Sequence, residues 1–150
     1  MSKRTPKRAL FDTSVLVAGM VSRHPKFEVA HKLLEQVVIG KITGLVSTHS
    51  IAETFAVLTR LPHKPMIGPQ DARRLLETNL VMFEKIPLTE QDYFSVIARL
   101  EALQFSGGAI YDALIAQASL KAKAERLYSF NAPHFVRLGA DVARLVIEPT

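Results

Sequence analysis

Three acidic residues and one amide stand in the sequence where reactive groups are expected. Asp12 follows a short apolar segment, while Glu53 and Asp112 lie early in two helical segments, and Asn131 follows another strand-like segment. Ionised carboxylates brought together repel one another, so such a group needs a cation. Oxygen donors without Cys or His favour Mg²⁺ or Mn²⁺. One or two such ions can activate water for cleavage of a phosphodiester bond.

Strands and helices that alternate along the chain would position these residues. Strands are predicted at residues 9–11, 44–47, 85–87, 126–130 and 145–147, and helices at 13–20, 27–38, 50–60, 68–81, 89–103, 110–124 and 133–138. This alternation predicts an α/β fold, with a short, mostly parallel sheet and helices on both faces. Ligands bind such sheets at the carboxyl ends of the strands, where the strand order reverses. The four polar residues are predicted at that edge.

Each of the four residues also has a purely structural interpretation. Asp12 is a plausible N-cap of the helix that follows it, and Asn131 is a plausible cap as well. Ser50 and Glu53 have the spacing of a capping box, in which the glutamate bonds the backbone at the helix start. Asp112 suits a first helical turn, where a negative charge is favourable, although its sequence neighbours are apolar.

Length, composition and charge limit the class of protein. The chain has 150 residues, 48% hydrophobic and 22% charged, which predicts a single domain over residues 1–150. It contains no Cys, which excludes thiol chemistry and is typical of a reducing, cytoplasmic compartment. No apolar run is long enough to span a membrane. Residues 1–7 are predicted to form a basic flexible tail, and the net charge of +5 favours polyanions such as RNA.

Four segments resemble the motifs of the PIN-domain family in order and spacing, over nearly the whole chain. They are LFDTSVLV at 10–17, SIAETFAVL at 50–58, YDALIA at 111–116 and LYSFNAPHF at 127–135. The third segment is the most specific single match. In length and layout the chain is most similar to VapC-type toxins of toxin–antitoxin pairs. The resemblance implies a three-layer PIN-like fold.

The resemblance also implies a Mg²⁺- or Mn²⁺-dependent endoribonuclease, usually a homodimer, that a small antitoxin protein neutralises. Asp12, Glu53 and Asp112 would hold the metal, and a water activated there would hydrolyse the RNA phosphodiester bond. Asn131 stands where the family often has Asp. Its neutral amide would contact a metal through the carbonyl oxygen or through a water, so the resemblance is compatible with one bound metal ion or with two. Two serines, Ser14 and Ser129, would support the acids or contact the substrate.

Two other functions stay open at this point. A haloacid-dehalogenase-like phosphatase also begins with an apolar strand that ends in Asp, but its general acid two positions later is replaced here by Ser14. The other alternative is a degenerate PIN-like module that binds RNA or a protein partner without cleavage. Asn131 favours this module, and the three intact acids argue against it. Further candidates for contact with RNA phosphates are Arg60, Lys64, Arg126, His49 and His134.

Overall fold

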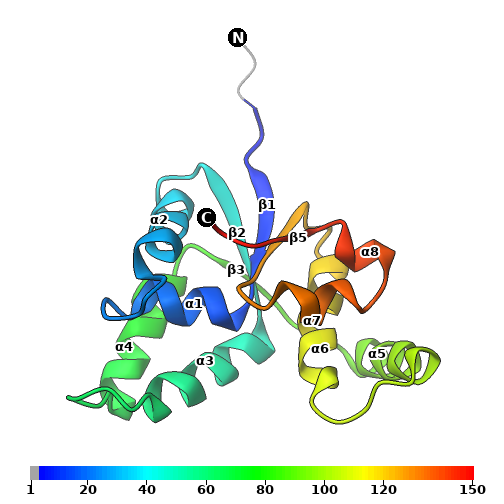
Figure 1. The fold of residues 1–150 in the computed structure, drawn as a ribbon. Helices are drawn as coiled ribbons and strands as arrows, with labels where there is room; N and C mark the ends of the chain where they lie inside the picture. The colour runs from blue at the N-terminus through cyan, green and yellow to red at the C-terminus, as the bar shows by residue number, and fades with distance from the viewer. Residues whose placement is uncertain (1–3) are drawn as a thin grey trace.

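The computed structural model describes residues 4–150, in which strands and helices alternate (Figure 1). The five strands of these residues are β1 (Lys7–Phe11), β2 (Ile42–Ser47), β3 (Glu84–Ile86), β4 (Arg126–Tyr128) and β5 (Val146–Ile147). The eight helices are α1 (Thr13–Met20), α2 (Phe27–Val38), α3 (Thr48–Arg60), α4 (Pro69–Leu80), α5 (Glu90–Leu103), α6 (Ala109–Lys121), α7 (Ala132–Val136) and α8 (Ala140–Ala143). Every predicted strand and helix is present, and α8 is the one element not predicted.

Local signals explain where several helices begin. Thr89 caps α5 through a capping box, in which the Asp92 carboxylate accepts a hydrogen bond from the Thr89 backbone N–H at 2.8 Å. α3 begins two residues earlier than predicted, because the Ser47 hydroxyl accepts a hydrogen bond from the His49 backbone N–H at 3.3 Å.

Within residues 4–150, no helix has the length and apolar character needed to cross a membrane.

All five strands run parallel, in the order β3-β2-β1-β4-β5. The chain therefore winds from β1 outward to β2 and β3, and then returns to the other side of β1 to form β4 and β5. In the β1–β4 pair, Ala9 lies opposite Arg126 and Phe11 lies opposite Tyr128. The strand order thus reverses between β1 and β4, and the carboxyl ends of these two strands lie side by side.

Helices cover both faces of the sheet, as predicted, which gives three layers (Figure 1). Side chains alternate between the faces along β1: Ala9 and Phe11 join one buried cluster, and Leu10 joins the other. The first cluster includes buried residues of α1, α2, α3 and α4, and the second includes buried residues of α5, α6, α7 and α8. The sheet is therefore a rigid support between two apolar cores, with its carboxyl edge left for polar residues.

The basic segment at the start of the chain is shorter than predicted. Lys7 belongs to β1 and lies opposite Ile42 of β2. The Arg8 guanidinium pairs with the Glu84 carboxylate, with Nη2 and Oε2 3.1 Å apart, and donates to the Ala122 carbonyl. These contacts place both residues in the sheet rather than in a tail. Residues 1–3 of the predicted tail lie outside the described residues.

Candidate active site

A hollow of about 380 Å³ lies at the carboxyl ends of β1 and β4. Asp12 follows β1, Glu53 lies in α3, Asp112 lies in the first turn of α6, and Asn131 follows β4. All four side chains line this hollow. The structure thus brings together the four residues proposed as metal ligands, at the point in the strand order where α/β proteins bind ligands.

Asp12 is buried, with 3% of its surface exposed. Its Oδ2 accepts two hydrogen bonds, from the Ser14 hydroxyl at 2.8 Å and from the Ser129 hydroxyl at 2.7 Å. Burial raises the pKa of Asp12, while the two hydroxyls oppose that rise. Asp12 occupies the N-cap position of α1, but its side chain makes no capping bond to that helix. The N-cap interpretation therefore does not account for this residue.

The two serines that bond Asp12 also connect it to the segment after β4. The Ser14 hydroxyl accepts a hydrogen bond from the Phe130 backbone N–H at 3.0 Å. The Ser129 hydroxyl accepts one from the Asn131 backbone N–H at 2.8 Å. Ser129 is completely buried, which favours support of Asp12 over contact with a substrate, the two roles predicted for it. Both serines use their hydroxyls to orient one oxygen of Asp12, and neither occupies the other oxygen.

Glu53 lies on α3 with about a third of its side chain exposed. Its Oε2 lies 3.1 Å from Nε2 of His49, one helical turn earlier. The capping-box interpretation of Ser50 and Glu53 is wrong, because the helix begins before Ser50 and the Ser50 hydroxyl is buried without a hydrogen-bond partner. Glu53 therefore makes no cap for the helix start and is available to the hollow.

Asp112 is a second acid of the hollow whose pKa is raised. Burial raises its pKa to about 6, and the negative charge of Asp12 adds to this effect. The His134 imidazole opposes the rise, with Nδ1 3.5 Å from Asp112 Oδ2. An apolar setting and neighbouring carboxylates both disfavour the ionised form. A cation bound beside Asp112 would favour its ionised form.

Sequence reasoning did not pair the two histidines with the acids. For His49 a signal exists, because His49 and Glu53 are four residues apart on one helix. For His134 there is none, because the fold alone brings α7 to Asp112. The His49 ring also stacks on Tyr111, with ring centroids 5.5 Å apart and planes 4° from parallel. Each of these acids thus has an imidazole beside it.

The donors around the hollow fit Mg²⁺ or Mn²⁺. Three carboxylates and one amide carbonyl are oxygen donors, which these ions prefer. Burial raises the pKa of both Asp12 and Asp112, the neighbouring carboxylates add to this rise, and a bound cation would favour the ionised forms. Over residues 4–150, no three or more His, Asp or Glu side chains are arranged as a cage that could hold a metal ion. Mg²⁺ needs no such cage, because it usually binds one or two carboxylates and completes its shell with waters and substrate phosphates.

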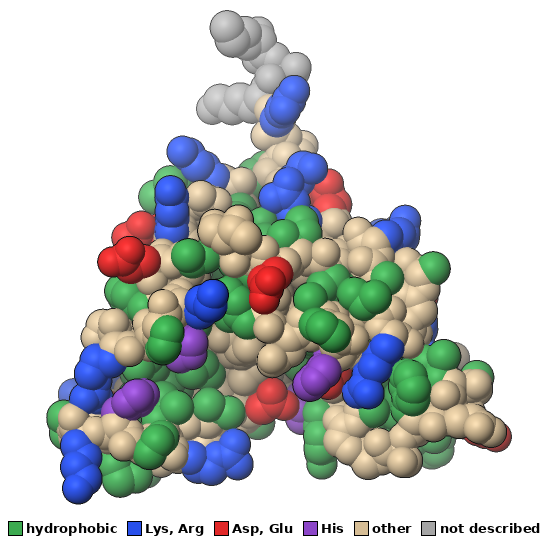
Figure 2. Space-filling view, viewed as in Figure 1, with side chains coloured by type: hydrophobic (Ala, Val, Ile, Leu, Met, Phe, Trp, Pro, Cys, Tyr) green, Lys and Arg blue, Asp and Glu red, His purple; other side chains and the backbone are tan. Residues whose placement is uncertain are grey.

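Two basic loops border the hollow. The α1–α2 loop contributes Arg23, His24 and Lys26, of which His24 and Lys26 line the hollow. The Arg23 guanidinium donates to the backbone carbonyl of Lys64, which joins this loop to the α3–α4 loop. Burial and the positive charge of His63 in that second loop both lower the pKa of His24. Figure 2 shows Lys, Arg and His side chains gathered over these loops, at the lower left of the molecule.

One predicted RNA contact lies elsewhere. Arg126 begins β4, so it lies at the amino end of the sheet rather than at the carboxyl end. Its guanidinium donates to the Tyr128 hydroxyl at 3.0 Å. Arg126 therefore lies away from the acidic hollow, and its place in the fold does not favour it as a contact for RNA bound there. Arg60 and Lys64, by contrast, lie in the chain beside the hollow-lining Leu61.

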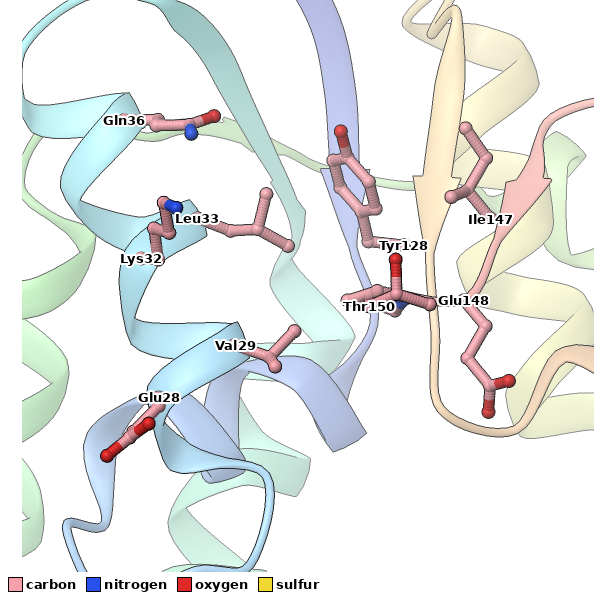
Figure 3. A pocket seen from close by; sticks show the side chains of 10 residues that line it. Glu28, Val29, Lys32, Leu33, Gln36, Tyr128, Ile147, Glu148 and Thr150 are labelled. Carbon is pink, nitrogen blue, oxygen red and sulfur yellow. The ribbon is translucent and has the colours of Figure 1, made fainter.

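A larger groove of about 460 Å³ lies between α2 and the end of the chain. Figure 3 shows Val29 and Leu33 of α2 facing Tyr128 across it, while Glu28 and Glu148 point away at its rim. Its two carboxylates do not converge, and its walls are mainly apolar. The larger volume of this groove therefore does not identify it as an active site, and the smaller acidic hollow is the candidate active site.

The fold and this acidic edge define a known class of protein. The chain belongs to the PIN domain family, whose model matches residues 9–140. Within that family it belongs with the VapC toxins. It is 33% identical to ribonuclease VapC27 of Mycobacterium tuberculosis over 114 residues, which are 76% of this chain and 78% of VapC27. It is 35% identical to ribonuclease VapC40 of the same species over 104 residues, which are 69% and 72% of the two chains.

Solved structures confirm the α/β PIN fold. The crystal structure of Mycobacterium tuberculosis VapC20, a toxin that cleaves the sarcin–ricin loop, superposes with a TM-score of 0.67 at 16% identity, over 84% of this chain and 92% of VapC20. A chain of Rickettsia felis VapBC2, bound to a promoter DNA fragment, superposes with a TM-score of 0.68 at 19% identity, over 95% of this chain and 99% of that one. The family predicted from the four sequence motifs is thus confirmed.

Proposed function

We propose that this protein is a metal-dependent endoribonuclease and the toxin of a VapBC-type toxin–antitoxin pair. One observation carries the proposal: Asp12, Glu53 and Asp112, from three separate elements, line one hollow at the switch point of the sheet. The relatives named as ribonucleases support RNA as the substrate class. The reducing compartment indicated by the absence of Cys supports a cytoplasmic location.

In this proposal the three acids hold Mg²⁺ or Mn²⁺, and Asn131 adds its carbonyl oxygen. When bound there, such an ion polarises a phosphate oxygen and activates a water toward phosphodiester hydrolysis. Ser14 and Ser129 keep one oxygen of Asp12 fixed by hydrogen bonds, which leaves the other for ligand contact. Asn131 is neutral and supplies no negative charge, so the residues favour one tightly held ion over two.

The surroundings of the acids support a polyanionic substrate. His24 and Lys26 line the hollow together with the acids, and Arg60 and Lys64 lie one and three residues from the hollow-lining Leu61 in the sequence. Positive side chains beside acidic metal ligands suit a phosphate backbone, which the basic residues attract and the metal engages. We therefore propose that the RNA backbone enters the hollow from the two basic loops.

Two protein partners form part of the proposal. The Rickettsia felis structure pairs a VapC with its VapB, which supports a small antitoxin as a partner of this chain. A homodimer is supported by apolar side chains exposed on α5, namely Tyr93, Phe94 and Ile97. An apolar patch of this kind is typical of a protein interface. Light scattering would show a homodimer as a mass of about twice 16.6 kDa.

Cleavage of RNA by the purified protein, free of antitoxin, tests the proposal directly. We expect cleavage with Mn²⁺ or Mg²⁺ and none with EDTA. Asp12→Asn should reduce the rate by at least about 100-fold, since even residues behind metal ligands contribute 10- to 100-fold. The matched control is Asp71→Asn, an equal change of charge at an exposed residue of α4, which should cleave like the wild type.

The alternative is a degenerate PIN module that binds RNA or a partner without cleavage, which Asn131 favours. It predicts that the folded protein cuts neither tRNA, ribosomal RNA nor total RNA with either metal. It also predicts that Asp12→Asn leaves RNA affinity unchanged. Metal-independent cutting, or full activity in Asp12→Asn, would contradict the proposed mechanism itself.

A further inference from the structure

An aromatic pair stands beside the acids and takes no part in the chemistry described so far. Tyr111 immediately precedes Asp112, so their Cα atoms are about 3.8 Å apart. His49 lies one helical turn before Glu53 on α3. The two rings therefore bridge α3 and α6 next to two acids of the hollow, although neither ring lines it, and they stack with centroids 5.5 Å apart and planes 4° from parallel.

In this pair His49 is held in place by a neighbouring acid, whereas Tyr111 is exposed to solvent. His49 is held by Glu53, with Nε2 and Oε2 3.1 Å apart, and only 22% of its side chain is exposed. Tyr111 is 53% exposed although one face of its ring rests on His49. Its other face is thus presented to solvent as a flat apolar surface. A ring held in one orientation loses little conformational freedom when a ligand binds.

The helix α3 gives the direction in which a nucleic acid would pass. His49 lies near its start, Glu53 follows one turn later, and Leu61 just after its end lines the hollow beside the basic loops. At 1.5 Å per residue, His49 and Glu53 are separated by about 6 Å along the axis, and His49 and Leu61 by about 18 Å. Basic loops, acids and aromatic pair therefore lie in that order along one helix.

We propose that the open face of Tyr111, supported from behind by His49, stacks on an unpaired base of the RNA next to the scissile phosphate. Proteins recognise single-stranded RNA by stacking unpaired bases on aromatic side chains. Every base has a π-face, so this contact selects single strands over duplexes rather than one sequence over another. The inference rests on the proposed ribonuclease function and specifies the form of RNA that enters the site.

Binding measured without cleavage tests the contact. In the Asp12→Asn background, a labelled single-stranded oligoribonucleotide of mixed sequence is titrated against Tyr111→Ala, Tyr111→Phe and a control, Met82→Ala, at an exposed apolar residue that precedes β3. We expect Tyr111→Ala to weaken binding roughly 5- to 100-fold, the range typical of one stacked base. Tyr111→Phe should restore it, because stacking needs only the ring, and Met82→Ala should bind unchanged. Affinity for a duplex of the same sequence should not depend on Tyr111.

A second measurement reports the stack itself. The chain contains no Trp, so Tyr111→Trp introduces a single indole at the proposed contact. Single-stranded RNA should quench its fluorescence, and Met82→Trp should show no such quenching. Equal RNA affinity of folded Tyr111→Ala and the wild type would overturn the proposal. A lower mass of Tyr111→Ala in light scattering would also overturn it, since the ring would then belong to a contact between protein chains.

These results separate the stacking contact from the nuclease. Metal-dependent cleavage that does not depend on Tyr111 would overturn the stacking contact and leave the proposed function standing. Quenching of Tyr111→Trp by RNA, in a protein that cuts nothing, would support the contact and overturn the nuclease. In cleavage assays, removal of the ring should raise KM for single strands more than it lowers kcat, because Tyr111 binds a base and not the reacting phosphate.

Discussion

Two hydroxyls hold one carboxylate oxygen at the centre of the acidic hollow. Asp12 accepts hydrogen bonds from Ser14 and Ser129, and each serine in turn accepts one from the backbone that follows β4. Hydrogen bonds to a charged acceptor are roughly twice as strong as neutral ones. The burial of Asp12 is therefore compensated in part by its neighbours, and a cation bound as proposed would add to this compensation. The same small group of residues thus orients the Asp12 carboxylate and offsets part of the cost of its burial.

The raised pKa of Asp112 makes the stability of the metal-free protein depend on pH. In the unfolded chain this carboxyl titrates near 3.9, and in the folded chain near 6. Between these values the folded state binds more protons, so the free energy of unfolding falls as pH rises through this window. We expect Asp112 to account for a fall on the order of 1–3 kcal/mol. Urea unfolding in EDTA from pH 4 to 7 measures it.

Asp112→Asn is the control for that prediction, because it removes the titrating group and keeps the shape. The variant should gain stability relative to the wild type as pH rises from about 4 to about 6. Asp92 and Asp141 have lowered pKa values and so stabilise the fold as pH rises, but they act equally in both proteins. An identical pH dependence of wild type and variant would show that Asp112 ionises freely. Millimolar Mg²⁺ should reduce the difference by stabilising the ionised wild type.

At the residue scale the sequence predicts which acids meet, but not what supports them. Asp12 and Asn131 follow strands, so the topology alone assigns them to one edge. The pairing of His134 with Asp112 depends on how α7 packs, and no local pattern encodes that contact. The choice between the two roles predicted for Ser129 depends on packing in the same way, since its complete burial is a property of the packed edge.

Polar contacts between two helices position Asp112 from a distance. Asp92 of α5 lies 2.8 Å from Lys121 Nζ and 3.3 Å from Gln117 Nε2, and both partners belong to α6, which carries Asp112. The Lys121 ammonium and the capping bonds at Thr89 hold the pKa of Asp92 well below its usual range. The start of α5 thus fixes the helix that presents an acid to the hollow.

Removal of the α5 cap should therefore cost stability without changing the chemistry of the site. We expect Thr89→Ala to lower the free energy of unfolding by about 1 kcal/mol, because the helix loses its N-cap side chain. Urea unfolding at pH 7 measures this change. Titration with Mn²⁺ at a temperature where the variant is folded should give the wild-type affinity. A large decrease in Mn²⁺ affinity would show that α5 acts on the site directly.

Element boundaries were predictable where a local signal marks them and uncertain elsewhere. α1 and α2 have the predicted bounds, and Thr89 caps α5 as its spacing with Asp92 indicates. For α3 two serines compete as caps, and only the packed structure shows that Ser47 takes this role while Ser50 is buried. α8 spans four residues, which is too short for a periodic pattern to reveal.

Over the whole molecule, the net charge of +5 should act through the two basic loops. Removing one basic side chain that binds a phosphate should reduce the slope of log affinity against log salt by about 0.7 for a single strand. We expect Arg60→Gln combined with Lys64→Gln to weaken RNA binding and to reduce this slope by about 1.4. Fluorescence anisotropy with Asp12→Asn protein, between about 50 and 200 mM salt, gives the slopes.

The control for this prediction removes the same charge at the opposite edge of the sheet. Lys41 precedes β2 and Lys123 follows α6, and both are exposed at the amino ends of the strands. The double variant Lys41→Gln and Lys123→Gln should keep the wild-type slope. Equal changes of the salt slope in the two double variants would indicate that RNA affinity depends on net charge alone and that the two basic loops do not bind the RNA backbone.

The reversal of strand order between β1 and β4 also determines when the site can first exist during synthesis. Asp12 and Glu53 leave the ribosome early, whereas Asp112, Ser129 and the strand that pairs with the other side of β1 are made much later. Domains fold during translation as their segments emerge. The two early acids therefore wait beside an unpaired strand edge until most of the chain has been made. A nascent chain that lacks the late segments has no assembled acidic hollow. An antitoxin synthesised at the same time could therefore fold before the hollow forms.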